Sequence, residues 1–159
     1  MTKNVKKPSK SLEYALKLLG QRSYSEKKLA EKLRLREVEP EEIQRVVSKL
    51  KELGFLDDLR FAKNYVESAQ NIRLAGHRKI YWQMIKKGIP KDIAEQAIEA
   101  VYSKDDEVQA IRRLIDKFAK NIPEDKMYER LMRRLISRGY DFDLVSKEVK
   151  RRIDYQGKI

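Results

Sequence analysis

The residues of this sequence with the most recognisable chemistry are two acidic runs, Asp57-Asp58 and Asp105-Asp106-Glu107. Carboxylates grouped in this way could bind Mg²⁺ and support metal-assisted hydrolysis. Each run also lies where a helix is expected to begin, and carboxylates there satisfy free N–H groups and the helix dipole. We therefore interpret both runs as helix caps, with Asp57 or Asp58 capping the helix that follows.

Other catalytic and cofactor sites have little support in the sequence. It contains one histidine, His77, and no cysteine, which excludes disulfides, thiolate metal sites and Cys/His nucleophile pairs. A glycine-rich phosphate loop of the Walker type is also missing. We expect His77 near the start of a helix, in a solvated position. The sequence thus predicts a protein without catalytic residues, metal or cofactor, which acts by binding.

The charge of the chain indicates what it could bind. A formal net charge of +12 attracts a polyanion or an acidic protein surface, with nucleic acid as the first candidate. Residues 59–91 contain eight Lys and Arg but one acid, Glu67. The segment Met1–Lys10 is basic and has no apolar core, and no stretch approaches the roughly 20 apolar residues of a membrane span. We therefore predict a cytoplasmic protein without membrane contact.

The candidate binding residues centre on a helix expected over residues 77–87. Arg78, Lys79, Lys86 and Lys87 surround its outer face, and Trp82 lies four residues from both Arg78 and Lys86. An exposed indole there could stack on a base or fill a protein pocket, or it could pack against an adjacent repeat. A solvated charged face would explain the remaining cations nearly as well. These further candidates are Arg60, Arg73, Arg130, Arg133, Arg134, Arg138, Lys150, Arg151 and Arg152.

Three windows of the sequence superimpose at an offset of about 51 residues, as Leu29, Ile80 and Leu131 do. Within each window the apolar residues recur every three or four positions, which is the helical period. A unit of roughly 50 residues is marginally stable alone, so neighbouring units should stack. We predict an all-α fold of nine helices, as three tandem three-helix repeats in an elongated, curved array. The predicted parts are a basic tail (1–10) and repeats at 11–55, 56–103 and 104–159.

The residues at the expected helix ends follow the same offset. Gly88 and Gly139 stand one offset apart, each just after a helical pattern, where glycine adopts the left-handed conformation that closes a helix. Glu37 occupies this position in the first repeat, so we expect a different turn there. Ser23, with Glu26 three residues on, fits a capping box.

One run resembles a family signature: Gly54-Phe55-Leu56-Asp57-Asp58-Leu59-Arg60-Phe61-Ala62, followed by Tyr65-Val66. It is similar to the signature of the RecX family, regulators of the RecA recombinase. Tyr24-Ser25 ahead of Leu29 resembles the first repeat of that family, and the segment from Gly76-His77-Arg78-Lys79-Ile80 to Lys87-Gly88-Ile89 resembles its second. The resemblance covers nearly the whole chain.

Two departures affect surface positions. Gln83-Met84 stands where the family often has Glu-Leu, and Lys28 replaces an acid that is common before Leu29.

The resemblance implies a monomer that binds the RecA–DNA filament along its groove and reduces ATP hydrolysis, strand exchange and co-protease activity. Binding to single- or double-stranded DNA alone should be weak and sequence-unspecific. The main alternative is a tandem helix-turn-helix-like DNA-binding protein that acts independently of RecA. A magnesium-dependent nuclease using the acidic runs and a scaffold without DNA affinity are further alternatives.

Overall fold

The computed structural model describes residues 9–156, and these residues form helices and connecting turns without a strand. The α-helices fall into three groups of three: α1 (Lys10–Gln21), α2 (Glu26–Arg34), α3 (Pro40–Glu52); α4 (Asp58–Asn71), α5 (His77–Lys86), α6 (Lys91–Val101); α7 (Lys104–Ala119), α8 (Met127–Ile136), α9 (Phe142–Gln156). A short 3₁₀ turn, Glu124–Lys126, precedes α8. The predicted fold class is confirmed. Most of the predicted basic tail, residues 1–8, lies outside the described residues.

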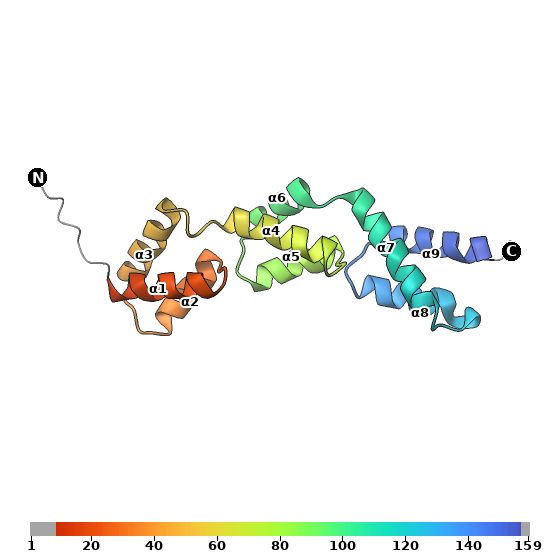
Figure 1. Ribbon diagram of the computed structural model, residues 1–159, viewed down its shortest axis with the longest axis horizontal. Coiled ribbons are helices and arrows are strands. Elements are labelled where there is room, and N and C mark those ends of the chain that lie inside the picture. Colours follow the sequence, from red (N-terminus) through yellow and green to blue (C-terminus); the bar gives the residue numbers. More distant parts are fainter. Residues whose placement is uncertain (1–8, 157–159) are drawn as a thin grey trace, which may run out of the picture.

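The three repeats follow one another in a row, with the two ends of the chain at opposite ends of the molecule (Figure 1). The row is elongated and gently bowed in this view. The second helix of each repeat (α2, α5 or α8) lies toward its lower side. A row of this kind places equivalent helices of successive repeats along one side of the molecule.

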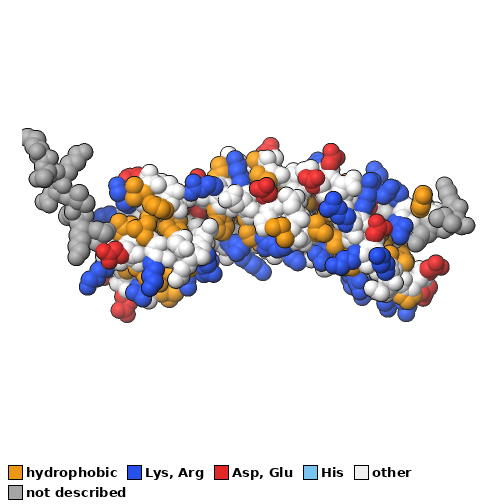
Figure 2. All heavy atoms as spheres, viewed as in Figure 1, with side chains coloured by type: hydrophobic (Ala, Val, Ile, Leu, Met, Phe, Trp, Pro, Cys, Tyr) orange, Lys and Arg blue, Asp and Glu red, His pale blue; other side chains and the backbone are white. Residues whose placement is uncertain are grey.

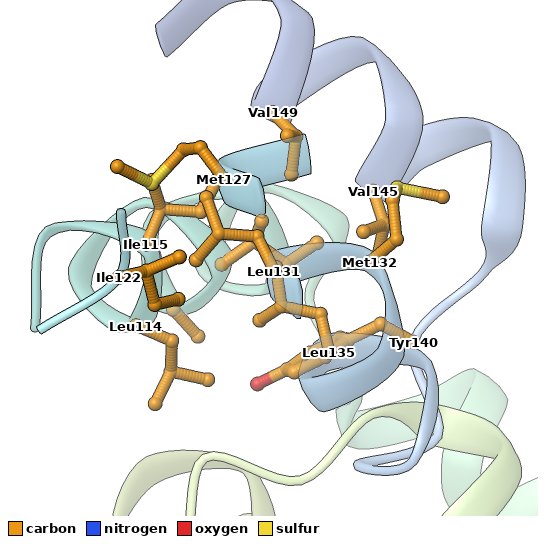
Figure 3. Close-up of a cluster of buried hydrophobic side chains, with 12 residues drawn as sticks. Leu114, Ile115, Ile122, Met127, Leu131, Met132, Leu135, Tyr140, Val145 and Val149 are labelled. Atoms are coloured by element: carbon orange, nitrogen blue, oxygen red, sulfur yellow. The ribbon is translucent and has the colours of Figure 1, made fainter. Parts of the chain in front are cut away.

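Each repeat has a hydrophobic core of its own. Leu29, Ile80 and Leu131, one from each second helix, are fully buried in three separate clusters. In the third repeat, Leu131 lies among side chains from α7 and α9, including Ile115 and Val149 (Figure 3). Truncating such a leucine to alanine typically costs about 2–5 kcal/mol. These contacts confirm that the recurring apolar positions face the repeat interiors.

The second helices of the first two repeats end in the same way, contrary to the expectation for Glu37. Glu37 has a φ of +57° and Gly88 a φ of +85°, so both take the left-handed conformation. The Glu37 N–H donates to Arg34 O and the Val38 N–H to Leu33 O, and the bonds after α5 follow the same pattern. This pair of hydrogen bonds satisfies two carbonyls at the helix end. The turn is therefore retained with a glutamate, at a conformational cost.

The first junction, between repeats 1 and 2, consists mainly of polar contacts at the start of α2. Ser25, not Ser23, is the N-cap, and its Oγ accepts from Lys28 N and donates to Lys87 O at 2.5 Å. Asp58 accepts from Glu26 N at 2.9 Å. Burial raises the pKa of the Asp58 carboxyl. The two aspartates thus have different roles: Asp57 is the N-cap of α4, whereas Asp58 accepts the free N–H of Glu26 at the start of α2.

The second junction, between repeats 2 and 3, brings two backbones into direct contact. Gly76 N donates to Arg138 O at 2.9 Å, and Arg78 N donates to Gly139 O at 3.2 Å. A Cβ on Gly76 would overlap the backbone of Gly139, and one on Gly139 would overlap the backbone of Lys79. Glycine at both positions is what allows this approach.

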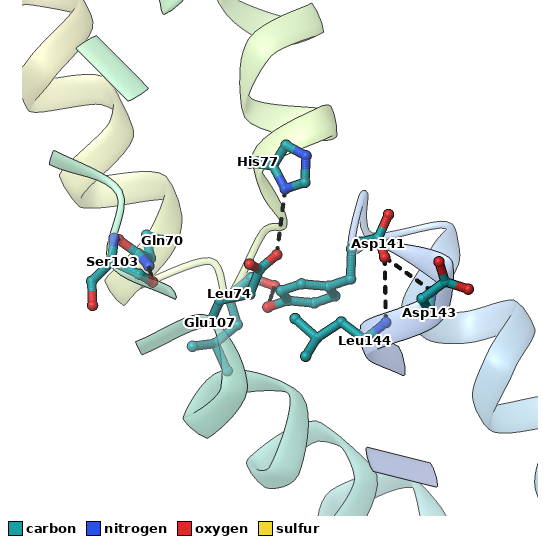
Figure 4. A network of polar contacts seen from close by, with 9 residues as sticks. Gln70, Leu74, His77, Ser103, Glu107, Asp141, Asp143 and Leu144 are labelled. Carbon is teal, nitrogen blue, oxygen red and sulfur yellow. Dashed lines mark hydrogen bonds and ion pairs between the residues drawn. The ribbon is translucent and has the colours of Figure 1, made fainter. Parts of the chain in front are cut away.

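Buried polar groups strengthen the second junction (Figure 4). The Gln70 amide donates to Ser103 O at 2.8 Å and accepts from Ser103 N at 3.3 Å, and the Tyr140 hydroxyl donates to Leu74 O. His77 opens α5 as predicted, but it is half-buried rather than solvated. Its Nδ1 lies 3.4 Å from Glu107 Oε1. The contact between His77 and Glu107 therefore links α5 of the second repeat to α7 of the third.

The two junctions use equivalent residues. Ser25 and Gly76 are one offset apart, and so are Lys87 and Arg138, so the contact Ser25–Lys87 corresponds to the contact Gly76–Arg138. In both, the C-terminal end of one second helix meets the N-terminal end of another. The helices α8, α5 and α2 therefore follow one another end to end.

Candidate functional site

Cations from the second helices and the turns beside them form a band that we call the basic edge. In Figure 2, Lys and Arg side chains gather along the lower border of the middle repeat, where Figure 1 draws α5, and also over the C-terminal repeat. Because the helices lie end to end, their cations form a series rather than isolated clusters. The basic edge consists of Lys28, Lys32, Arg73, Arg78, Lys79, Lys86, Lys87, Arg130, Arg134 and Arg138.

Two hollows lie along the basic edge where repeats meet. The first, of about 410 Å³, lies between repeats 1 and 2, and its lining includes Lys28, Lys32, Lys86 and Lys87 with the aromatic rings of Tyr24 and Phe61. The second, of about 340 Å³, lies between α5 and the turn after α8. Its lining includes Arg78, Lys79, Trp82, Lys86, Ile136 and Gly139. Cations beside apolar surface are suited to an anionic partner that also presents bases or side chains.

Tyr65 positions several cations at the middle of the basic edge. The Arg73 guanidinium lies 4.6 Å and the Lys87 ammonium 5.3 Å from the centre of the Tyr65 ring. Arg138 donates to Arg73 O at 3.2 Å, which ties the third repeat to the second. Side chains held in this way lose less conformational entropy when a partner binds.

The central cations of the edge are not neutralised by neighbouring acids. Within residues 9–156, no carboxylate lies within 4 Å of Arg78, Lys79, Lys86 or Lys87. Their charge is therefore available to a partner, and it is strongest at long range at low ionic strength.

Two predicted arginines on α9 take part instead in internal ion pairs. Arg151 lies 3.1 Å from Glu148, and Arg152 lies 3.4 Å from Asp116 on α7. Glu148 also accepts two hydrogen bonds from Arg112, which hold the pKa of its carboxyl below the usual value. Lys150 is exposed on the same helix. The pairs Arg112–Glu148 and Arg152–Asp116 link α7 to α9.

Two further candidates have local partners. Arg60 donates to Gly54 O at 2.6 Å, so its side chain bridges the start of α4 and the end of α3. Arg133 forms an ion pair with Glu129 four residues earlier on α8. Both side chains are exposed; Glu129 offsets the charge of Arg133, whereas Arg60 keeps its charge and donates to a neutral carbonyl.

Trp82 is 60% exposed, so it does not bury its indole against the adjacent repeat. The ring meets Tyr81 edge-on, with centroids 5.4 Å apart. It borders the hollow that faces the turn after α8, as well as a further hollow between α5 and α6. Exposed tryptophan is uncommon and often marks a binding surface.

The sequence interpretation missed the contribution of α2, where Lys28 and Lys32 extend the edge into repeat 1. A signal was present in the repeat offset, which equates Lys28 with Lys79 and Arg130. Acidic residues interleaved in α2, such as Glu31, conceal this in a simple count of charge. Glu31 is paired with Lys28 at 2.7 Å, so the charges of both side chains are partly offset.

Within the described residues, no group of three or more His, Asp or Glu side chains is arranged to hold a metal ion. The acidic run that opens α7 is a helix start, with Ser103 accepting from Asp106 N as the N-cap. A search of the same residues finds no helix with the length and apolarity of a membrane span.

Tandem three-helix repeats joined through their second helices, with a basic edge along the joints, define a class of helical-repeat binding proteins. Residues 12–50 match the first three-helix domain of RecX, and residues 57–98 match its second three-helix domain. The chain belongs to the RecX family, a family of regulatory proteins.

The relatives include the regulatory protein RecX of Caldanaerobacter subterraneus subsp. tengcongensis, which is 33% identical over 134 residues, 84% of this chain and 66% of the relative. The regulatory protein RecX of Prosthecochloris aestuarii is 32% identical over 134 residues, 83% of this chain and 86% of the relative. The crystal structure of RecX from Lactobacillus salivarius has the same fold, with a TM-score of 0.83 and 24% identity over 92% of this chain and 96% of that one.

Proposed function

We propose that this chain regulates the RecA recombinase by binding the RecA–DNA filament along its helical groove as a monomer. Bound there, it lowers ATP hydrolysis, strand exchange and co-protease activity through binding alone, without catalysis of its own. The proposal places this activity in the cytoplasm.

The observation that carries the proposal is the end-to-end line of α2, α5 and α8. It repeats cations at equivalent positions, such as Lys28, Lys79 and Arg130, along one side of an elongated molecule. A filament offers equivalent surfaces at regular intervals, so a binder with repeated contacts gains from each one. Membership of a family of regulatory proteins named RecX also favours RecA as the target.

A titration of this protein into RecA, single-stranded DNA and ATP tests the proposal. Hydrolysis should fall at equal or lower ratios of this protein to RecA. No inhibition at any ratio would contradict the proposal.

The basic edge is tested by exchanging Arg78, Lys79, Lys86 and Lys87 together for Gln. We expect filament binding to weaken by about tenfold or more, because four unpaired charges are lost. The control exchanges four exposed lysines outside the edge, Lys17, Lys91, Lys104 and Lys117, which removes the same charge. Equal loss in both variants would show that only net charge matters.

The alternative, DNA binding independent of RecA, is favoured by the hollow between repeats 1 and 2, which combines cations with Tyr24 and Phe61. This function predicts steeply salt-dependent binding to DNA alone with no effect on RecA ATP hydrolysis. The same titration, with DNA retention measured in parallel at several salt concentrations, distinguishes the two functions.

A further inference from the structure

Between α5 and α6 lies a hollow of about 420 Å³ whose chemistry differs from that of the basic edge. We call it the Trp82 notch. Its lining consists of His77, Arg78, Tyr81 and Trp82 from α5 and Glu95, Ile98 and Glu99 from α6.

The two glutamates of the notch are unfavourable for α6 itself. Glu95 and Glu99 are exposed and one turn apart, so their charges repel each other. Glu99 also lies in the last turn of α6, where a negative charge opposes the helix dipole and where no basic residue is present to offset it. Among residues 9–156, no Lys or Arg comes within 4 Å of either carboxylate. A chain of net charge +12 thus keeps an unpaired acidic pair beside its exposed tryptophan.

The aromatic wall of the notch completes a site for a cation. Trp82 is mostly exposed, and Tyr81 contacts it edge-on at an interplanar angle of 80°. The face of an indole attracts cations, and a planar guanidinium can stack on it while donating to carboxylates. A phosphate, in contrast, would be repelled by Glu95 and Glu99.

We propose that the Trp82 notch receives an arginine side chain from a protein partner, stacked on Trp82 and paired with Glu95 and Glu99. This inference rests on the proposed function, in which the partner is the RecA component of the filament. It assigns the α6 flank of α5 to protein contact rather than DNA contact. Arg78 lines both the notch and the neighbouring basic hollow, so its guanidinium can turn toward the latter when the notch is filled.

The first test replaces Glu95 and Glu99 together with Gln and measures binding to RecA filaments on single-stranded DNA and to the same DNA alone. We expect about tenfold weaker filament binding, although the net charge of the variant is two units more positive, because the guanidinium loses both carboxylates. Binding to DNA alone should be unchanged or tighter. The matched control, Glu41→Gln with Glu67→Gln, makes the same charge change at exposed sites outside the notch. Filament binding of the notch variant equal to that of the control would overturn the proposal.

A second test needs no RecA, because Trp82 is the only tryptophan in the chain and its fluorescence reports on the notch directly. N-acetyl-arginine amide should change this fluorescence saturably, whereas the neutral isostere N-acetyl-citrulline amide should not. The arginine response should disappear in the Glu95→Gln, Glu99→Gln variant. Equal responses to both probes would overturn the notch. If the wild-type chain does not bind filaments, the proposed function fails, while this titration still decides the chemistry of the notch.

Self-association is the remaining outcome for the occupant. A dimer detected by sedimentation, and lost on replacing Glu95 and Glu99, would show that a second copy of this chain supplies the cation. That result would overturn the assignment to a different protein.

Discussion

At the first junction the hydroxyl of Ser25 donates to Lys87 O, whereas at the second the backbone N–H of Gly76 donates to Arg138 O. The positions are equivalent in the repeat, so the difference between the junctions is local. A serine side chain separates the two helix ends at the first junction, while glycine lets two backbones touch at the second. Both junctions contain buried polar side chains, Ser25 and Asp58 at the first and Gln70 at the second, but within residues 9–156 only the second has backbone–backbone hydrogen bonds.

This difference teaches how the molecule divides mechanically. Repeats 2 and 3 share backbone hydrogen bonds, which open only when larger parts of the structure unfold. Repeat 1 is attached through contacts at the start of α2. We therefore expect repeats 2 and 3 to move as one unit and repeat 1 to move relative to them.

The largest expected effect comes from adding a methyl group at the turn glycines of the two junctions. Gly139→Ala should lower the free energy of unfolding by about 3 kcal/mol, because the new Cβ meets the backbone of Lys79. Gly88→Ala should cost about 2 kcal/mol, since its Cβ would lie 3.0 Å from the Ser25 hydroxyl, which can yield. Urea unfolding measures both.

Gly54→Ala provides the control for this comparison. Gly54 has a similar φ of +75°, and a Cβ there would meet nothing within 4 Å, so only backbone strain of about 1 kcal/mol remains. Equal losses at all three glycines would show that the junctions are equally loose.

The next effect compares one polar side chain from each junction. Gln70→Ala should cost about 2 kcal/mol, because it leaves both backbone groups of Ser103 without their partner. Ser25→Ala should cost about 1 kcal/mol, mainly through the lost cap of α2. Thermal unfolding measures the losses, and hydrogen exchange should place the Ser25→Ala effect in repeat 1. A larger loss for Ser25→Ala would reverse the ranking of the junctions.

The contributions of Glu148, in the third repeat, and Asp58, at the first junction, to the free energy of unfolding should change with pH in opposite directions. The pKa of Glu148 is lowered by Arg112, so its stabilisation is present above the unfolded value of 4.5 and is lost as the pH falls through the folded value. Glu148→Gln should therefore cost about 1 kcal/mol at neutral pH and less in acid. The pKa of Asp58 is raised by burial above 3.8, so its ionisation opposes folding as the pH rises. Asp58→Asn, which keeps an oxygen to accept from Glu26 N, should be slightly stabilising at neutral pH only.

Unfolding of both variants from neutral to acid pH measures these slopes. A Glu148→Gln loss that grows in acid would contradict the sign for the third repeat. An Asp58→Asn gain that persists below the unfolded pKa would contradict it for the first junction.

The smallest effect concerns repeat 1 without touching either junction. Glu37→Gly should stabilise the chain by about 0.5–1 kcal/mol, because glycine adopts the left-handed conformation of this turn without strain. Glu37→Ala, which retains a Cβ, should give no such gain. Chemical unfolding of the two variants checks the difference.

Much of the fold could be predicted because buried positions such as Leu29, Ile80 and Leu131 recur at one offset with helical spacing. The turn at Glu37 could not, because the hydrogen bonds that close the helix outweigh the preference of a single residue. The cap at Ser25 rather than Ser23 was missed for a related reason, since Ser25 also bonds across the junction to Lys87.

The candidate site was only partly predictable. The cations of α5, such as Lys79 and Lys86, follow from helical spacing alone, and the structure leaves them free of acids within the described residues. In the sequence Arg151 and Arg152 resemble these free cations, but the structure pairs Arg151 with Glu148 on the same helix and Arg152 with Asp116 on α7. The Arg152–Asp116 pair depends on tertiary packing, which composition does not encode, whereas the Arg151–Glu148 pair follows from the i,i+3 spacing on α9.

The end-to-end line of second helices also determines the spacing of the cations along the basic edge. The thickness of each joint sets the interval between one row of cations and the next, and the joint is two backbones at Gly76 but a hydroxymethyl group wider at Ser25. Exchanging a small residue at a joint therefore changes the distance between the cations of successive second helices without altering any charge. The spacing between the rows of cations thus depends on two residues that carry no charge.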